Sequence, residues 1–253
     1  MELCWLTTEK CNQRCKYCDR FLEEGNLSTK DHFNILKKLI SYGVKKLTFG
    51  GGESLLLSCF ADIVKKSSAN GIRLKLVTNG KLLSQNADLI PYFDEITLSL
   101  DAVESSINNE LGRGADHFDN VCKAVLLIKK QHEKVNININ TVVTKINLNE
   151  VKNLTRFIAE WNINQWRLFR FCPLRGTALL NRASFEITDD QFLAVCAVVK
   201  QNNLNCAVQF KNYEDMEKGY LLITPKGKLC VSRELKDFEV GDMLKDDLSR
   251  WFL

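Results

Sequence analysis

The chain of 253 residues contains only three prolines and three histidines, and it has no long apolar run. The scarcity of proline favours regular secondary structure, while 45% apolar and 26% charged residues exclude a disordered or fibrous chain. The longest apolar run, near Phe192–Val199, is too short to cross a membrane. The first residues also lack the basic and apolar regions of a signal peptide, so we expect a cytoplasmic protein without a membrane partner.

The sequence also lacks a strong charge of either sign. Its formal net charge is +4, and the basic residues are dispersed along the chain. A nucleic-acid partner requires a more concentrated basic surface, so we expect none. A mild basic excess is compatible with an anionic small-molecule substrate.

Cysteine, in contrast, is abundant, with ten residues. Because no secretion signal is expected, reduced thiols or metal ligands are better interpretations than disulfides. Three cysteines are crowded together: Cys11, Cys15 and Cys18. The others lie among apolar neighbours, and most of them are expected to be small core residues. These are Cys4, Cys59, Cys122, Cys172, Cys196, Cys206 and Cys230.

Short apolar or β-branched runs alternate with amphipathic helical patterns along most of the chain. The expected strands are Leu3–Leu6, Lys46–Phe49, Leu74–Thr78, Glu95–Leu100, Val135–Val143 and Gln165–Phe171. Helical patterns begin near Ser28, after Ser58, near Phe118, at Val151 and at the capping box Thr188-x-x-Gln191. This alternation predicts an α/β fold with a parallel sheet. Six strands are too few for the usual eight-stranded barrel, so we favour a partial (β/α)₆ barrel over a doubly wound open sheet.

The pattern changes after Lys211. Tyr220–Thr224 and Lys228–Val231 flank the turn Pro225-Lys226-Gly227 and predict a hairpin, and Asp246–Phe252 predicts a short terminal helix. We therefore expect a barrel over residues 1–210 and an extension over residues 211–253. The extension is expected to pack on the barrel, with its hairpin against the barrel base.

The crowded cysteines form a CxxxCxxC motif directly after the first expected strand. Thiolates are soft ligands that select zinc, copper(I) or iron–sulfur clusters. A zinc site usually needs a second ligand pair, and His32, His117 and His132 are not suitably spaced to supply one. Three cysteines fit a [4Fe–4S] cluster in which one iron has no protein ligand and is open to a substrate or cofactor. A zinc half-site or a chance grouping is the alternative.

A second motif, Gly50-Gly51-Gly52-Glu53, follows the second expected strand. Glycines allow a ligand to approach the backbone closely, and Glu53 offers an acceptor for an ammonium group. The segment lacks both the GxGxxG spacing and the GK[ST] ending of phosphate-binding loops. Taken alone, it would be interpreted as a structural turn.

Together, the two motifs resemble those of the radical S-adenosylmethionine (SAM) superfamily, including the aromatic Tyr17 before the last cysteine. The resemblance extends from Leu3 to about Phe171 and implies a partial (β/α)₆ barrel. It implies that Cys11, Cys15 and Cys18 ligate a [4Fe–4S] cluster whose fourth iron is chelated by SAM. Reductive cleavage of SAM would then give a 5′-deoxyadenosyl radical that abstracts hydrogen from the substrate. An electron donor such as flavodoxin or ferredoxin is implied as a partner. Ser54 departs from the proline usual after Gly-Gly-Glu.

The same resemblance implies further SAM-binding residues at the strand ends. These are Tyr17, Gly51, Gly52, Glu53, Asn79, Ser99 and Arg113. Asn79 lies in a Thr-Asn-Gly segment similar to one that reaches the SAM ribose. Ser99 and Arg113 correspond to residues that hold the SAM carboxylate, which suits the bidentate geometry of arginine. An ordinary turn at Asn79 and a solvated loop charge at Arg113 are the structural alternatives.

Two late segments look like those of viperin-type nucleotide dehydratases, a group that acts on the ribose of nucleoside triphosphates. They are Asn140–Asn147 and Trp166–Arg170. This resemblance implies that Lys145, Arg167 and Arg170 bind the triphosphate, and it suggests a role in antiviral defence. Strand alternation puts Arg167 and Phe169 on one face, which we take as the inward one, because an inward arginine needs an anion. Pairing of Arg167 with a core carboxylate is the alternative.

Departures from the viperin pattern keep other functions open. No histidine precedes Cys11, and Phe171-Cys172-Pro173 replaces the usual continuation. The segment from Leu222 to Leu248 also resembles the start of the cysteine-rich extension of peptide- or metabolite-modifying radical SAM enzymes. A second cluster would have to use Cys172, Cys196, Cys206 and Cys230, which are widely spaced in the sequence. A further alternative is a non-catalytic iron–sulfur or zinc module.

Overall fold

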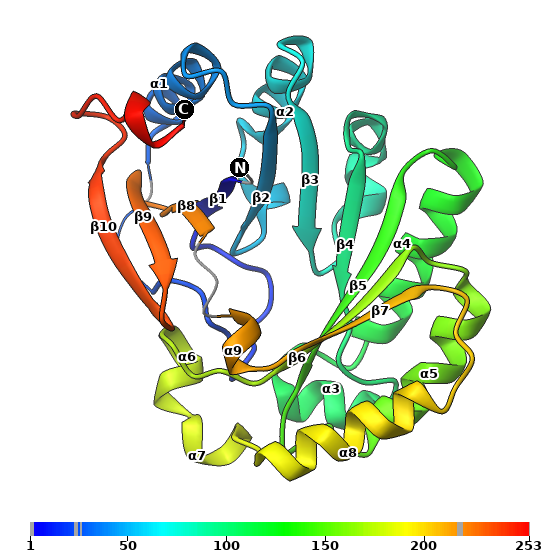
Figure 1. Ribbon diagram of the computed structural model, residues 1–253. Coiled ribbons are helices and arrows are strands. Elements are labelled where there is room, and N and C mark those ends of the chain that lie inside the picture. The colour runs from blue at the N-terminus through cyan, green and yellow to red at the C-terminus, as the bar shows by residue number, and fades with distance from the viewer. Residues whose placement is uncertain (1–2, 23–24, 26, 217–219, 253) are drawn as a thin grey trace.

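The computed structural model describes residues 3–22, 25, 27–216 and 220–252 (Figure 1). Within these residues, the strands form one sheet in the order β10-β9-β8-β1-β2-β3-β4-β5-β6-β7. The neighbours from β8 through β1 to β7 are parallel, whereas β9 pairs antiparallel with both β8 and β10. The strands are β1 (Leu3–Thr8), β2 (Lys46–Gly51), β3 (Arg73–Thr78), β4 (Glu95–Ser99), β5 (Asn136–Val143), β6 (Gln165–Arg170), β7 (Ala207–Lys211), β8 (Tyr220–Ile223), β9 (Lys228–Arg233) and β10 (Lys236–Asp242).

The sheet curves into an open barrel whose outer face is covered by helices (Figure 1). The α-helices are α1 (Thr29–Ser41), α2 (Phe60–Ala69), α3 (Ser105–Leu111), α4 (His117–Gln131), α5 (Glu150–Trp161), α6 (Gly176–Leu180), α7 (Arg182–Phe185), α8 (Asp189–Lys200) and α9 (Tyr213–Met216). Three 3₁₀ segments are η1 (Ser54–Leu56), η2 (Leu83–Tyr92) and η3 (Ser249–Trp251). Because β10 and β7 are the two edges of the sheet, the barrel does not close.

The main core lies between the sheet and the outer helices. The rings of Trp5 in β1 and Phe49 in β2 are tilted against each other with centroids 6.0 Å apart, and Phe49 contacts Phe60 of α2 edge to face at 5.1 Å. All three side chains are buried, and burial of large aromatic groups is the main stabilising term here. Helix α1 begins where the sequence indicated, since Ser28 and Asp31 form a capping box.

The predicted partial barrel is confirmed, because the six expected strands are β1 to β6 and lie consecutively in the sheet. The capping box at Thr188 and the predicted hairpin, now β8 and β9, are also present. After β3, the connection is the 3₁₀ segment η2 rather than a regular α-helix. This segment contains Pro91 and is kinked at Asn86.

The carboxy-terminal region differs from the sequence expectation. Strands β7 and β10 were not predicted, and the expected start of the extension at residue 211 is the last residue of β7. The hairpin does not pack on the barrel base. Instead, β8 pairs parallel with β1 from Leu3↔Leu221 to Trp5↔Ile223, so the extension continues the sheet and covers an edge that would otherwise be open. The predicted terminal helix is only the short turn η3.

In the described part of the chain, no helix is both long and apolar enough to span a membrane.

Candidate active site

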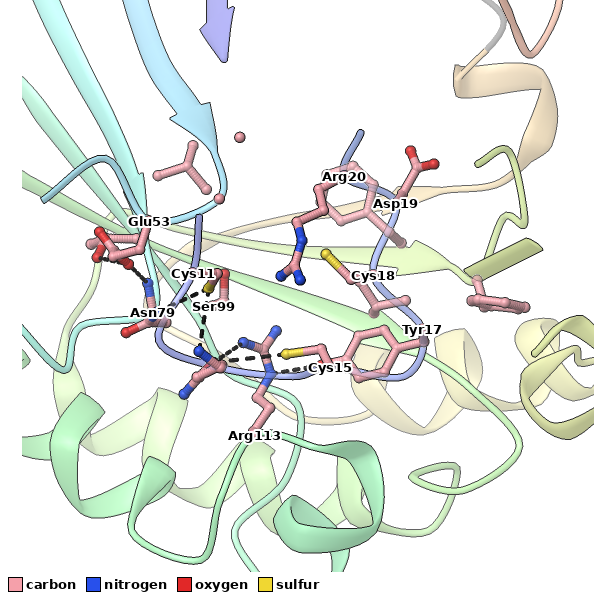
Figure 2. Close-up of a pocket in the computed structure, with 18 of the residues that line it drawn as sticks. Cys11, Cys15, Tyr17, Cys18, Asp19, Arg20, Glu53, Asn79, Ser99 and Arg113 are labelled. Carbon is pink, nitrogen blue, oxygen red and sulfur yellow. Dashed lines mark hydrogen bonds between the residues drawn. The ribbon is translucent and has the colours of Figure 1, made fainter. Parts of the chain in front are cut away.

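The carboxyl ends of the parallel strands meet at one end of the barrel, and the loop after β1 lies across this end (Figure 1). In parallel α/β barrels, functional side chains gather at this end. A cavity of about 280 Å³ opens there, and Figure 2 shows side chains from the cluster loop and several strand ends pointing into it. We call residues 9–20 the cluster loop.

All three crowded cysteines border this cavity. Cys15 is buried, whereas Cys11 and Cys18 are half-buried, and all three are free thiols. Burial raises the pKa of the Cys15 thiol to about 11 and also raises the pKa of Cys18. A metal centre that bound these thiols would therefore have to displace their protons. The described residues contain no group of three or more Cys, His, Asp or Glu side chains arranged to hold one metal ion, and a four-iron cluster holds its thiolates farther apart than one ion does.

Backbone hydrogen bonds fix the cluster loop from two sides. On one side, the amides of Arg14 and Lys16 donate to the carbonyls of Gly112 at 3.1 Å and Leu111 at 3.0 Å. On the other side, α6 approaches the loop. The Ala178 amide donates to the Cys18 carbonyl at 3.0 Å, and the Thr177 hydroxyl donates to the Cys15 carbonyl at 2.9 Å. The cysteines are thus held by the chain itself.

Three glycines make these close approaches geometrically possible. A Cβ atom on Gly52 would lie 2.1 Å from the Lys10 carbonyl oxygen. A Cβ on Gly112 would lie 2.2 Å from the Arg14 oxygen, and one on Gly176 would lie 2.4 Å from the Arg20 oxygen. No other residue type fits these positions without shifting backbone. Gly112 and Gly176 also have positive φ angles of 83° and 60°, which glycine adopts readily.

Glu53 is buried beneath the glycine turn and is satisfied by neighbouring groups. One carboxylate oxygen accepts from the Thr78 hydroxyl at 2.8 Å and the Asn79 amide at 3.0 Å, while the other accepts from the Leu55 amide at 3.4 Å. Desolvation raises its pKa, and these hydrogen bonds oppose that rise. Glu53 therefore joins the ends of β2 and β3 at the cavity wall, and a ligand ammonium group would share a carboxylate that is already fixed in position.

Arg113 is held by a buried acidic partner. Its Nε donates to the Asp101 carboxylate and to the Tyr17 hydroxyl, and its Nη1 donates to the Gln13 side-chain oxygen at 3.1 Å. Tyr17 in turn donates to Asp101 at 2.5 Å, so both side chains depend on one carboxylate. Asp101 raises the pKa of Arg113 well above its ordinary value despite burial, which keeps the guanidinium charged. Among the described residues no hydrogen bond uses Nη2, which remains available to a ligand at the cavity.

A second series of hydrogen bonds links Gln13 to Ser99. The Gln13 amide nitrogen lies 3.0 Å from Nδ1 of His117, and Nε2 of His117 lies 2.9 Å from the Ser99 carbonyl oxygen. Since a carbonyl only accepts, Nε2 carries the proton and Nδ1 accepts from Gln13. Burial, followed by the charge of Arg113, lowers the pKa of His117 well below its ordinary value, so the ring is neutral. The cluster loop is thereby connected to β4 through its own side chains.

The predicted SAM-binding residues are brought together, because Tyr17, Gly51, Gly52, Glu53, Asn79, Ser99 and Arg113 all border the same cavity as the cysteines. The predicted substrate residues are not gathered in the same way. Only Arg170 borders the cavity, and Lys145 is exposed in the loop after β5.

Arg167 and Arg170 have protein partners. Arg167 lies 3.4 Å from Glu95, the first residue of β4, so its guanidinium is directed away from the mouth of the barrel. Phe169, which precedes the strand end on the same face as Arg167, does border the cavity. Arg170 donates to Asp189, to Asn212 at 3.2 Å and to the Ile187 carbonyl at 2.8 Å. Its guanidinium also lies 4.1 Å from the centre of the Tyr213 ring.

Sequence reasoning missed several residues at the site: Gln13, Asp19, Arg20, Asp101 and His117. Gln13, Asp19 and Arg20 border the cavity from within or next to the cysteine motif. Asp101 and His117 do not border the cavity themselves. Asp101 is hydrogen-bonded to Arg113 and His117 to Gln13, and both of these partners do border it. Asp101 directly follows the Ser99-Leu100 strand end, and this position was a usable signal because buried aspartates at such ends need partners. The contact of His117 with the loop links residues 104 positions apart, which no local pattern indicates.

The structure does not bring the four scattered cysteines together. Cys196 is on α8, which leads into β7 at one edge of the sheet, whereas Cys230 is in β9 near the other edge. Cys196 packs into the main hydrophobic core. These positions give no support to a second cluster built from Cys172, Cys196, Cys206 and Cys230.

Comparison with known proteins matches this site to a family. Residues 5–158 match the model of the Radical SAM superfamily. The chain is 31% identical to an S-adenosylmethionine-dependent nucleotide dehydratase from Flammeovirga pacifica, over 87% of this chain and 78% of that protein. A relative of the same name from Lacinutrix mariniflava is 28% identical over 87% of this chain but only 48% of its own length.

A solved structure confirms the fold. SuiB from Streptococcus suis, in complex with S-adenosylmethionine, matches with a TM-score of 0.72 at 18% identity, covering 99% of this chain and 65% of SuiB. The chain thus spans slightly less than two thirds of that protein. The motifs around Cys11 and Glu53 therefore led to the correct family. The chain is an enzyme of the radical SAM superfamily and belongs, within it, to the S-adenosylmethionine-dependent nucleotide dehydratases.

Proposed function

We propose that this enzyme binds a [4Fe–4S] cluster and SAM at the barrel mouth and dehydrates the ribose of a nucleoside triphosphate. The observation that supports this proposal is the convergence of three free thiols, a buried glutamate and a buried arginine on one cavity. These groups come from separate loops, so only the fold assembles them. The names of the relatives supply the nucleotide as the substrate class.

The residues present fit an iron–sulfur cluster. Cys11, Cys15 and Cys18 face one cavity, and the cluster loop is fixed by the close approach of Gly52, Gly112 and Gly176. A loop held in this way presents its thiols without a large ordering cost on binding. When bound, the cluster would supply the electron for reductive cleavage of SAM, whose product abstracts hydrogen from the substrate.

The surrounding residues suit the zwitterionic end of SAM. Glu53 offers a fixed carboxylate for the ammonium group, and Arg113 offers its remaining Nη2 for the carboxylate. Gly51 and Gly52 let that end approach the backbone, while Ser99, Asn79 and Tyr17 complete the wall. Asp101 keeps Arg113 charged and correctly directed, so we assign it a positioning role.

The triphosphate is assigned to the late strands and to the far side of the cluster loop. Lys145 and Arg170 lie at the ends of β5 and β6, whereas Arg167 lies deeper in the barrel and would have to leave Glu95 to reach the triphosphate. We add Arg20 to this group because it borders the cavity and its buried Nε has no hydrogen-bond partner among the described residues. A substrate held there would lie across the barrel mouth, facing the SAM side.

The test is anaerobic reconstitution followed by assay of 5′-deoxyadenosine with dithionite, in the presence of single nucleoside triphosphates or of peptides. We expect one or more nucleotides to stimulate 5′-deoxyadenosine and to yield a nucleotide lighter by one water. Stimulation by peptides alone would replace the dehydratase proposal with the peptide-modifying alternative. A protein that binds only zinc and does not cleave SAM would support the non-catalytic module.

A further inference from the structure

The cluster loop carries a buried glutamine that the spacing of its cysteines does not require. Gln13 lies between Cys11 and Cys15, and it is only 4% exposed. Its hydrogen-bond partner His117, the first residue of α4, is also buried. Buried amide and imidazole groups are costly unless their polar atoms find partners, so these partners determine how the two side chains are oriented. The functions assigned so far use neither side chain.

The orientation of Gln13 is fixed by a series of hydrogen bonds that starts at the backbone of β4. The carbonyl oxygen of Ser99 can only accept, so Nε2 of His117, at 2.9 Å, carries the ring proton. Nδ1 of the neutral ring is then an acceptor, and it receives the Gln13 amide nitrogen at 3.0 Å. The Gln13 side-chain oxygen is thereby turned toward Nη1 of Arg113, at 3.1 Å. A backbone carbonyl thus determines which end of the Gln13 amide contacts Arg113.

A neutral acceptor at Nη1 holds the Arg113 guanidinium without cancelling its charge. Asp101 supplies one negative charge at Nε, and the Gln13 oxygen satisfies Nη1 without supplying a second. Among the described residues no hydrogen bond uses Nη2, and Arg113 borders the cavity. Two guanidinium nitrogens are therefore held from different directions, and the third remains for an anionic ligand.

We propose that Gln13 and His117 are positioning residues for SAM that act through Arg113. His117 sets the orientation of the Gln13 amide, and Gln13 holds the guanidinium so that Nη2 faces the SAM carboxylate. This inference rests on the proposed function, which assigns that carboxylate to Arg113. Because Gln13 lies within the cysteine motif, the loop that supplies the thiols also sets the direction of a SAM-binding side chain.

The experiment measures SAM binding to the anaerobically reconstituted enzyme by calorimetry, together with iron content and urea denaturation. Gln13→Met keeps the length of the side chain but removes both of its hydrogen bonds. Gln13→Glu keeps an oxygen beside Arg113 but adds a negative charge, and His117→Leu removes the acceptor that orients the amide. The matched controls are Gln131→Met and Gln131→Glu, at the exposed last residue of α4.

We expect Gln13→Met to raise the Kd for SAM about tenfold, because a hydrogen bond to a charged group is lost. His117→Leu should raise it several-fold, and Gln13→Glu about a hundredfold, because the new carboxylate repels that of SAM. Iron content should equal that of the wild type in all three variants, since the thiols and the backbone contacts of the loop remain. The two Gln131 variants should bind SAM as the wild type does.

Two further measurements separate positioning from a merely structural role. In dithionite-driven assays, Gln13→Met should raise the apparent KM for SAM in parallel with the Kd, while kcat stays within about twofold. Added to Arg113→Ala, Gln13→Met should cause no further loss of SAM affinity, because its effect is transmitted by Arg113.

Wild-type SAM affinity in both Gln13 variants would overturn the proposal, and these variants decide it even where His117→Leu does not fold. A further tenfold loss when Gln13→Met is added to Arg113→Ala would also overturn it, because Gln13 would then act by another route. If Arg113→Ala alone leaves SAM affinity unchanged, the assignment of the SAM carboxylate in the proposed function is rejected, and this inference is rejected with it.

Discussion

Two arginines, one proposed to bind SAM and one proposed to bind the substrate, are held in different ways. Arg113, on the SAM side, has a side chain 9% exposed and is paired with Asp101, whose side chain is fully buried. Arg167, on the substrate side, is 21% exposed and lies 3.4 Å from Glu95, which is 16% exposed. A buried pair is costly to break, whereas a more open pair contributes little to stability. Arg113 is therefore a fixed part of the fold at the cavity, whereas Arg167 is less buried and lies away from the cavity beside Glu95.

The largest expected effect is on the SAM side. We expect the triple variant Cys11→Ala, Cys15→Ala, Cys18→Ala to lose the bound cluster and all SAM cleavage but to remain folded. Cys15 and Cys18 contribute only to a small second hydrophobic cluster, and all three cysteines lie outside the main core, whose packing is unchanged. Iron and sulfide content, visible absorption and circular dichroism measure this outcome. Cys122→Ala on α4 is the matched control and should retain the cluster; SAM cleavage by the triple variant would refute the assignment of the ligands.

A glycine substitution tests whether cluster binding needs the close backbone contact between Gly112 and the cluster loop. We expect Gly112→Ala to lower cluster loading strongly, because its Cβ would meet the Arg14 carbonyl at 2.2 Å. Gly43→Ala is the matched control, since Gly43 has a similar φ of 73° but nothing within 4 Å of its Cβ. Both variants carry the backbone cost of a left-handed residue, about 1–2 kcal/mol. Equal iron content in the two variants would show that the close approach is not needed for loading.

The arginine pairs themselves give the direct test of the comparison. We expect Arg113→Ala to lower the free energy of unfolding by about 3–5 kcal/mol, because Asp101 would be left buried without its counter-charge. We expect Arg167→Ala to cost only about 1 kcal/mol, because Glu95 keeps its ion pair with Lys75 at 3.6 Å and some contact with solvent. Urea denaturation of both variants measures the difference. Equal losses would contradict the distinction between a fixed and a more open arginine.

Ligand binding should separate the two arginines in the same variants. Glu53→Ala and Arg113→Ala should weaken SAM binding by about 1.5–3 kcal/mol each, with the cluster retained. Arg167→Ala should leave SAM affinity nearly unchanged and lower nucleotide affinity by several-fold to a few hundred-fold, from one charged contact of about 1.5–3 kcal/mol. Titrations of SAM and of the stimulating nucleotide check both expectations. If Arg167→Ala responds to the nucleotide as the wild type does, Arg167 only forms an ion pair with Glu95 and does not bind the nucleotide.

The smallest effect is expected at Lys145, which is exposed at the rim. Lys145→Ala should raise the nucleotide concentration needed for half-maximal 5′-deoxyadenosine formation about threefold, because an exposed charge is strongly screened. The effect should disappear at high salt. A larger loss than that of Arg167→Ala would mean that the triphosphate lies at the rim rather than deeper in the barrel.

The gathering of the three cysteines, Glu53 and Arg113 at one cavity was predictable from the sequence because the motifs that carry them are local. The CxxxCxxC spacing, the glycines before Glu53 and the segment around Arg113 each lie within a few residues. Contacts between residues far apart in the sequence were not predictable in this way. Strand alternation predicts which face of β6 carries Arg167, but not that its partner is Glu95, which is 72 positions away.

Strand β7 was missed although Cys206, just before it, and Val208 and Phe210 within it alternate and pack against the main core, which was a usable signal. Strand β10 was missed because its side chains are mostly polar or exposed and show no clear apolar period. Pairing with an existing sheet edge stabilises both strands.

Transfer of deuterium tests the central claim most directly. The reconstituted enzyme is incubated with SAM, dithionite and a nucleoside triphosphate whose ribose is fully deuterated, and the 5′-deoxyadenosine is analysed by mass spectrometry. The proposed chemistry predicts 5′-deoxyadenosine that carries deuterium, formed together with a nucleotide that has lost water. Stimulated formation of 5′-deoxyadenosine without deuterium, or no stimulation by any nucleoside triphosphate, would contradict hydrogen abstraction from a ribose held at this cavity.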